Sequence, residues 1–349
     1  MTFSRFFALG FFLLITNPLL FSQSSGNRTF SSSGLDSLSR FLEYKGSSAM
    51  MIVKDDSVVF SWGATDQKLL VHSIRKSLLN SLIGIAVSEG KIDTNSTLSD
   101  WNIDDKMALS EQEKSARIAD LLASRSGVYH LAAATSTGML RNKPSRNSHA
   151  PGSHYYYNNW DFNVLGFILE QAYSTSLYTL FDERIAQPLG MTDYQNNIDT
   201  VILNPGEEDI EISEADGFYQ FETDKSVYPA YHFRLTTKDM IRYARLYLQN
   251  GNWEGKQIIP ADWIRSSTTP KSVYNEQYGL SYGLLWYVLV DKGDSERHSF
   301  YHTGTGVHMM AVYPSSNMVF VHRVDTEQPY QFTGRDLIGM INLVFGALE

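Results

Sequence analysis

Residues 73–90 read SIRKSLLNSLIGIAVSEG, and this stretch decides how the rest of the chain is organised. From Leu69 to Ser88 the apolar residues fall on most sides of a helix rather than along one stripe, and Gly90 ends the run. A helix that is hydrophobic almost all round lies in the interior of a protein. The pattern therefore predicts a buried central helix over 69–88.

Two polar residues stand near the start of this predicted helix. Ser73 and Lys76 are three positions apart, so their side chains share a helix face and can meet. Burial and the helix dipole both lower the pKa of such a lysine, toward a value at which the amine accepts a proton. A serine next to an unprotonated amine is an activated nucleophile, so the pair predicts acyl transfer through a covalent intermediate.

The spacing Ser-x-x-Lys is weak evidence by itself, because the chain contains it twice. Ser88 and Lys91 repeat it where the helix ends, and a lysine there is an ordinary complement to the negative end of the helix dipole. We interpret this second copy as structural. The interpretation of Ser73 depends on what the rest of the chain supplies.

Two later motifs supply further groups that acyl transfer needs: a proton relay and contacts to the substrate. The segment YYYNNWDFNVLGFILEQ precedes and enters a predicted helix, and it holds Tyr157 and Asn159. A phenol can relay a proton and an amide can hold an acyl carbonyl. Further on, HTGTG over residues 302–306 begins a predicted strand, where small residues let a substrate lie along the strand edge.

The order Ser-x-x-Lys, Tyr-x-Asn, His-Thr-Gly resembles the serine β-lactamase and penicillin-binding protein superfamily, in its class C-like and esterase-like branch. Flanking segments such as RIADLLASRSGVYH, APGSHYYYNNWDFNVLG and IAQPLGMTDY are similar to recurring blocks of that superfamily, and the likeness runs from about residue 48 to 346. Its details look similar to relatives of 6-aminohexanoate-dimer hydrolase, which act on amides or esters rather than β-lactams.

The resemblance implies a role for each matching residue. Ser73 would be the acylated nucleophile, Lys76 its general base, and Tyr157 an assistant in proton transfer. The backbone N–H groups of Ser73 and Thr305 would form the oxyanion hole. The residues implied to contact substrate are Asn159, His302, Thr303 and Gly304.

Two features of the motifs need comment. Tyr156 and Asn158 also fit Tyr-x-Asn, and we choose Tyr157 and Asn159 because the Leu-Gly pair at 165–166 then falls at the family's spacing. His302 stands where many β-lactamases have a lysine, and a mostly neutral histidine is a weaker clamp for a substrate carboxylate. This histidine favours an amidase or esterase. It does not exclude a β-lactamase or a D-Ala-D-Ala carboxypeptidase that uses the same site, and this remains the alternative.

The element pattern predicts an α+β fold of the β-lactamase/transpeptidase type. A helix over 34–43 and two strands near 50–60 come first, and strands over 284–290, 309–313 and 318–324 with a helix over 337–348 come last. We expect an antiparallel sheet flanked by the N- and C-terminal helices. A mainly helical lobe, about 91–230, is inserted, and residues 34–349 form one hydrolase domain.

The first 22 residues predict export. Arg5 is followed by an apolar run to about Leu20, and then by small polar residues, which is the pattern of a secretory signal peptide. Residues 23–33 are Ser-rich and expected to be a flexible leader. The mature protein is accordingly expected to be secreted or periplasmic, with no stable membrane span after signal cleavage.

Composition excludes several other classes. The net charge is −9 without a long basic run, which argues against a nucleic-acid partner, and the absence of Cys removes disulfides and thiol catalysis. The nine His residues contain no His-Glu-x-x-His pair, so we expect no metal and no cofactor. The expected partner is a small-molecule or short-peptide amide or ester.

Two alternative functions and one further candidate residue stay open at this stage. Ser281 lies in Gly-x-Ser-x-Gly, the pattern of the α/β-hydrolase elbow, although the residues after it look like a strand rather than the required helix. His149 is close in sequence to Tyr157 and is a candidate for a supporting contact. A non-catalytic binding module on the same fold would have lost the serine, lysine or tyrosine, and all three are present.

Overall fold

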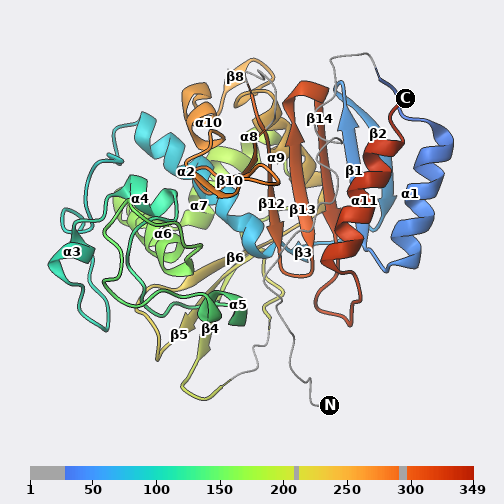
Figure 1. The fold of residues 1–349 in the computed structure, drawn as a ribbon. Coiled ribbons are helices and arrows are strands. Elements are labelled where there is room, and N and C mark those ends of the chain that lie inside the picture. Colours follow the sequence, from blue (N-terminus) through green and yellow to red (C-terminus); the bar gives the residue numbers. More distant parts are fainter. Residues whose placement is uncertain (1–27, 208–211, 291–296) are drawn as a thin grey trace.

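The computed structural model describes residues 28–207, 212–290 and 297–349, and it is built around an eight-stranded antiparallel sheet (Figure 1). The strand order is β2-β1-β14-β13-β12-β11-β10-β9, so β1 pairs with β14, the last strand of the chain, and β2 forms the edge beside β1. This is the fold class predicted from the sequence, in which the two ends of the chain build one sheet.

The strands are β1 Ala49–Lys54, β2 Ser57–Gly63, β3 Leu69–Leu70, β4 Ile198–Leu203, β5 Gly217–Glu222, β6 Ala230–Leu235, β7 Asn252–Trp253, β8 Lys256–Gln257, β9 Ser272–Asn275, β10 Leu280–Tyr282, β11 Tyr287–Leu289, β12 Ser299–Gly304, β13 His308–Tyr313 and β14 Met318–Arg323. The α-helices are α1 Ser32–Tyr44, α2 Arg75–Ser88, α3 Glu111–Lys114, α4 Ile118–Leu122, α5 Thr137–Arg141, α6 Asn159–Tyr173, α7 Leu177–Phe181, α8 Gln187–Leu189, α9 Thr237–Leu248, α10 Ala261–Ser267 and α11 Gly334–Gly346.

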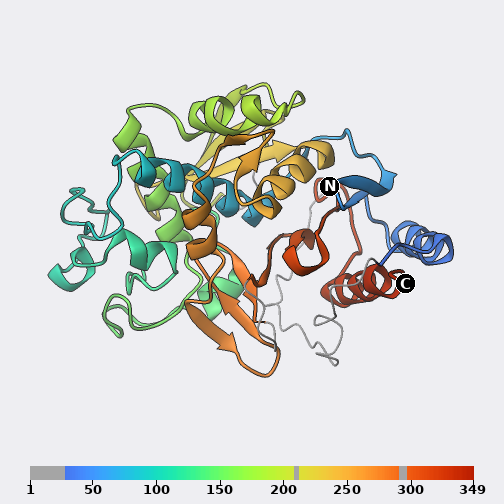
Figure 2. The ribbon, with the colours of Figure 1, turned by 90° about the horizontal axis from the view of Figure 1, so that it is seen from above.

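Strands β1, β13 and β14 of the large sheet are buried on both faces, whereas the edge strands β2 and β9 are largely exposed. Helices α1 and α11 lie side by side on one face, and α9 packs on the other face against β13, β14 and β1 (Figures 1 and 2). Because side chains alternate along a strand, Met50 and Ile52 of β1 join the core beneath α1 and α11, while Met51 and Val53 join the core on the α9 side. All six residues of β1 are buried, which explains why its first five residues are all apolar.

The expected leader 23–33 ends earlier than predicted. Helix α1 begins at Ser32, and the three residues before it pair with the C-terminal end of the chain. The Ser31 N–H donates to the Ala347 carbonyl at 2.8 Å, and Phe30 forms a β-bridge with Leu348. These backbone partners come from the far end of the sequence, so local composition could not reveal them. The predicted signal peptide, 1–22, lies outside the described residues.

The inserted lobe is less helical than predicted. Helices α3 to α8 occupy its first part, but β4, β5 and β6 follow and form a second sheet in the order β3-β6-β5-β4. Strand β4 is largely exposed and pairs parallel with β5, so it shows neither a buried run nor clear alternation. This sheet was missed because tertiary pairing, rather than a hydrophobic pattern, defines it.

The central helix also begins later than predicted. Leu69 and Leu70 form β3 and pair with Leu235 and Arg234 of β6, and α2 starts only at Arg75. From that point to Ala86 every residue of α2 is buried, as its apolar sequence predicts. The short strand therefore ties the start of the helix to the second sheet.

Gly84 provides a test of how tightly α2 is packed. A Cβ at this position would overlap the buried indole of Trp263 on α10, whose Nε1 donates to the Asn80 carbonyl at 2.9 Å. We expect Gly84→Ala to lower the free energy of unfolding by about 1–3 kcal/mol in urea denaturation, because overpacking forces the indole to move. Gly346→Ala is the matched control: nothing lies within 4 Å of its Cβ, so the better helix former does not lower stability.

Candidate active site

Ser73 lies at the junction of the two sheets. It is the middle residue of a 3-10 turn, His72–Ile74, between β3 and α2, rather than part of the helix proper. His72 has a φ of +49°, a left-handed conformation that is uncommon for a residue other than glycine. Such backbone strain is retained where the surroundings fix the turn, and here it presents the partly exposed Ser73 at the front of the buried helix.

Lys76 is fully buried behind Ser73, and its Nζ donates a hydrogen bond to Ser73 Oγ at 2.9 Å. The amine lies 4.8 Å from the ring centre of Tyr157 and 4.9 Å from that of Phe162. Burial, assisted by the neighbouring Arg75 charge, holds the pKa of Lys76 well below its usual value. The structure thus brings the predicted pair together and disfavours the charged form of the lysine.

Tyr157 closes the other side of this amine. It comes from the loop before α6, and its ring stacks on Tyr287 of β11 at 5.9 Å between centroids. Burial raises the pKa of Tyr157, while the Ser73 hydroxyl and the Arg75 charge oppose that rise. The phenol consequently keeps its proton at neutral pH and has a proton to give.

The two overlapping Tyr-x-Asn registers differ in the structure. Asn158 caps α6: its Oδ1 accepts from the Trp160 N–H at 3.2 Å, and its Nδ2 donates to the Val128 carbonyl at 2.7 Å. Asn159 donates to the Ala134 carbonyl at 2.5 Å, and its buried Oδ1 has no hydrogen-bond partner among the described residues. Asn158 is thus occupied by the helix cap, whereas the amide oxygen of Asn159 is not.

Strand β12 brings the third motif to the same place. A Cβ on Gly304 would lie 2.8 Å from the Val71 carbonyl oxygen, 2.9 Å from His72 Cβ and 3.4 Å from the Ser73 nitrogen, so only glycine lets the strand come this close. Thr303 is partly buried and Thr305 is exposed in the turn that follows. Within the described ranges, no turn or loop hydrogen bond uses the backbone N–H of Ser73 or Thr305.

His302 is completely buried on β12. Its Nδ1 lies 3.0 Å from the Thr303 carbonyl oxygen, which can only accept, so Nδ1 carries the proton and Nε2 a lone pair. Burial, together with the charge on Lys76 when it is protonated and that on Arg75, lowers the pKa of His302 to about 3. The ring is neutral at physiological pH and cannot act as a positively charged clamp.

Arg323, at the end of β14, is a site residue that sequence reasoning missed. Its guanidinium is fully buried and donates to the carbonyls of Leu69 (2.7 Å), Leu70 (3.3 Å) and Leu235 (2.9 Å), and its Nε donates to His308 at 2.9 Å. Burial lowers its pKa to about 9, so it stays charged at neutral pH. Arg323 thereby joins the large sheet to the backbone just before Ser73. In the sequence, the indication of this role was a charged residue, Arg323, at the end of the mostly apolar run MVFVHR.

The remaining candidates lie in other surroundings. His149 stacks on His154 at 3.9 Å between ring centroids and contacts Tyr129 and Ser148; no contact with Tyr157 is found in the described structure. Ser88 donates to the Ile85 carbonyl at 2.8 Å, which agrees with a structural interpretation of the second Ser-x-x-Lys.

Ser281 is not an elbow nucleophile. It lies within strand β10, is fully buried, and donates to the Ser272 carbonyl at 2.9 Å. The residues that follow lead into strand β11 rather than into a helix. The α/β-hydrolase alternative is therefore wrong, because its nucleophile must sit exposed between a strand and a helix.

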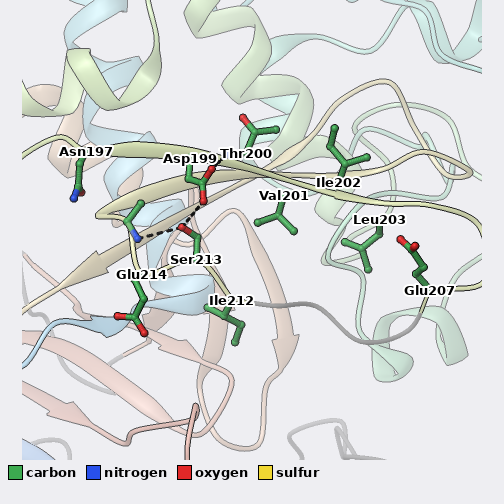
Figure 3. A pocket seen from close by; sticks show the side chains of 11 residues that line it. Asn197, Asp199, Thr200, Val201, Ile202, Leu203, Glu207, Ile212, Ser213 and Glu214 are labelled. Carbon is green, nitrogen blue, oxygen red and sulfur yellow. Dashed lines mark hydrogen bonds between the residues drawn. The ribbon is translucent and has the colours of Figure 1, made fainter.

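A groove of about 830 Å³ lies elsewhere on the molecule, outside β4 (Figure 3). Its wall includes Asp199 and Ser213, whose hydroxyl donates to that carboxylate at 2.8 Å. Strand β4 is at the opposite edge of the second sheet from β3, so this groove is separate from Ser73. Across the described residues, no group of three or more His, Asp or Glu side chains could hold a metal ion, and no helix is both long and apolar enough to cross a bilayer.

Comparison with known proteins identifies the family of this chain. The model of the beta-lactamase family matches residues 38–339, so the chain belongs to the beta-lactamase family and is a serine hydrolase. Over 192 residues it is 27% identical to a D-aminopeptidase of Brucella anthropi, a stretch that is 46% of this chain and only 35% of that enzyme.

Solved structures share the fold at low sequence identity. A Bacillus anthracis protein provisionally assigned as a 6-aminohexanoate-dimer hydrolase superposes with a TM-score of 0.63 at 18% identity, covering 88% of this chain and 80% of that one. A class C beta-lactamase gives 0.63 at 14% identity, covering 89% and 95%. EstCE1, a hydrolase with promiscuous acyltransferase activity, gives 0.62 at 15% identity, covering 90% and 98%.

The neutral state of His302 can be tested by a pH profile. Activity is expected to fall with decreasing pH as Lys76 becomes protonated, and His302 stays neutral until about pH 3. His302→Gln should therefore leave the acid limb of kcat/KM for p-nitrophenyl acetate in place between pH 5 and 10, even if the rate changes. A limb that moves or disappears would show that His302 titrates in this range.

Replacing Arg323 tests its role at the sheet junction. Arg323→Met leaves the carbonyls of Leu69 and Leu235 without charged donors. Since such hydrogen bonds contribute about 1.5–3 kcal/mol each, we expect the free energy of unfolding to fall by about 3 kcal/mol or more in urea denaturation. Arg265→Met, which removes an exposed pair with Asp262, should cost less than about 1 kcal/mol; equal losses would contradict the assignment.

Proposed function

We propose that this chain is an exported hydrolase that cleaves an amide or ester through an acyl-enzyme on Ser73, with Lys76 as general base and Tyr157 assisting proton transfer. The observation that carries the proposal is the buried Lys76 amine, 2.9 Å from Ser73 Oγ and disfavoured in its charged form. A charged surface lysine at the same spacing would not accept a proton near neutral pH.

Acylation begins when the proton of the Ser73 hydroxyl passes to the Lys76 Nζ lone pair as Oγ bonds to the substrate carbonyl carbon. The carbonyl oxygen becomes an oxyanion, and the backbone N–H groups of Ser73 and Thr305 are its proposed donors. Gly304 allows this arrangement, since any side chain there would push β12 away from the Ser73 backbone. The positive end of α2 adds further stabilisation of negative charge at Ser73.

Collapse of this intermediate breaks the bond to the leaving group. The departing nitrogen or oxygen takes a proton from Tyr157, which recovers one from the protonated Lys76. Tyr157 suits this role because its raised pKa keeps the phenol protonated until the leaving group needs it. Deacylation reverses the transfers: water gives a proton to the same pair and adds to the acyl carbon, and Ser73 Oγ leaves as the hydroxyl.

The substrate class follows from the relatives and from His302. The matched proteins include a D-aminopeptidase, a protein provisionally assigned as a 6-aminohexanoate-dimer hydrolase, and the hydrolase EstCE1, and they support an amide or ester substrate. A β-lactamase or D-Ala-D-Ala carboxypeptidase activity is the second candidate, favoured by class C beta-lactamases of the same fold. The uncharged His302 argues for the first candidate, because it removes one positive clamp for a carboxylate. The export proposal rests on residues 1–22.

Intact-mass spectrometry after incubation with a slowly turned-over ester or with a penicillin gives the direct test. We expect one acyl adduct, mapped by peptide analysis to Ser73, and turnover that is abolished in Ser73→Ala. A panel of p-nitrophenyl esters, nitrocefin, D-Ala-D-Ala peptides and the 6-aminohexanoate dimer then separates the two candidates.

Two serines serve as internal controls. Ser281→Ala and Ser88→Ala should keep most of the activity, because these hydroxyls donate to the Ser272 and Ile85 carbonyls and play no part in the reaction. An adduct on Ser281, or loss of turnover in Ser281→Ala with Ser73→Ala still active, would overturn the proposed mechanism.

A further inference from the structure

Arg75, between the nucleophile and its base, is a buried cation without a counter-ion. Only 3% of the residue is exposed, and its guanidinium lies over the ring of Tyr231 on β6, 5.1 Å from the centroid. Its Nε and Nη2 are shut off from water and make no hydrogen bond of good geometry to any described residue. Buried charges are normally paired or hydrogen-bonded, so this guanidinium has unused binding capacity.

The two unpartnered atoms of Arg75, Nε and Nη2, are arranged to bind a carboxylate. Nε and Nη2 form one edge of the guanidinium, and their N–H bonds are parallel at the spacing of two carboxylate oxygens. Such an edge takes a carboxylate in a bidentate manner, and pairing is stronger where water is excluded. The hydroxyl of Tyr231 is also buried, interacts with the Arg75 guanidinium and offers a further donor beside it.

Other cations near Ser73 cannot take this role. Lys76 is held mostly uncharged by burial and serves as the base, and burial lowers the pKa of both His302 and His72 to about 3. Arg323 is charged, but its N–H groups are used by backbone carbonyls and His308. Among the described residues around the nucleophile, Arg75 is the positive charge left for an anionic ligand.

Arg75 is also close to the reacting groups. It follows Ser73 by two residues, and its charge acts on the titration of Lys76, Tyr157 and His302. The guanidinium therefore belongs to the charged surroundings of the reacting groups.

We propose that Arg75 and Tyr231 form a carboxylate-binding subsite next to Ser73, so that the enzyme prefers amides and esters that carry a free carboxylate on the acyl group or on the leaving group. This inference rests on the proposed function of Ser73 and names the substrate class of the same site. It places the recognition of a carboxylate on α2 and β6, rather than on the His302 position of β12.

The test compares charged and neutral esters in the same enzyme. Mono-p-nitrophenyl glutarate against p-nitrophenyl pentanoate probes a carboxylate on the acyl side. 4-Acetoxybenzoate against its methyl ester probes one on the leaving group. We expect wild-type kcat/KM to favour the charged member of at least one pair, and Arg75→Met to reduce that charged-to-neutral ratio at least about tenfold.

The ratio isolates recognition from catalysis. Arg75 also lowers the pKa of Lys76, but a change in the base affects both members of a pair equally and cancels. Arg75→Lys keeps the charge without the parallel edge, and an intermediate ratio is expected. Arg40→Met, an exposed arginine on α1, matches the change in net charge and should leave the ratio unaltered.

The outcomes separate this inference from the proposed function. A wild-type enzyme that does not discriminate within either pair overturns the subsite, and so does an Arg75→Met variant in which both members change by the same factor. Neutral ester hydrolysis that depends on Ser73 shows that the hydrolase proposal stands even then. Absence of any Ser73 adduct or turnover would instead contradict the proposed function itself. If Arg75→Met does not fold, Arg75→Lys and Tyr231→Phe carry the same comparison.

Discussion

The burial of the Lys76 amine is the constraint on which the rest of the site depends. An ammonium group in this position would be cut off from water between the rings of Tyr157 and Phe162, with Arg75 adding repulsion. The uncharged amine avoids that cost and keeps a lone pair for Ser73. The protein can only do this because α2 is enclosed on all sides, by α6, α7, α10 and the second sheet.

Enclosing α2 requires that two sheets meet at its first turn. The large sheet reaches the turn through Gly304 of β12, whose missing side chain permits contact with Val71 and His72. The second sheet reaches it through β3, paired to β6. Arg323 joins the two by donating to backbone carbonyls of β3 and β6 from the end of β14. The strained φ of His72 is maintained by these surroundings, so the orientation of Ser73 is a product of the whole junction.

The distribution of charge around Ser73 distinguishes this chain from the pattern of the β-lactamases that it resembles. The third motif carries a histidine that burial keeps neutral, whereas Arg75, one residue before Lys76, carries a buried positive charge without a counter-ion. The Arg75 charge also helps to keep Lys76 unprotonated.

The sequence by itself determined the elements and pairings that depend on local pattern. The apolar character of α2, the spacing of Ser73 and Lys76, and the composition of the strands at both chain ends were sufficient to predict the fold class and the contact between Ser73 and Lys76. Tertiary structure decided what depends on distant partners: Asn158 rather than Asn159 as the helix cap, strand β4, the position of Arg323, and the protonation of His302 and Lys76. The physical reason is that pairing between distant strands and the desolvation of a charge depend on what surrounds a residue in space, which the order of the residues along the chain does not contain.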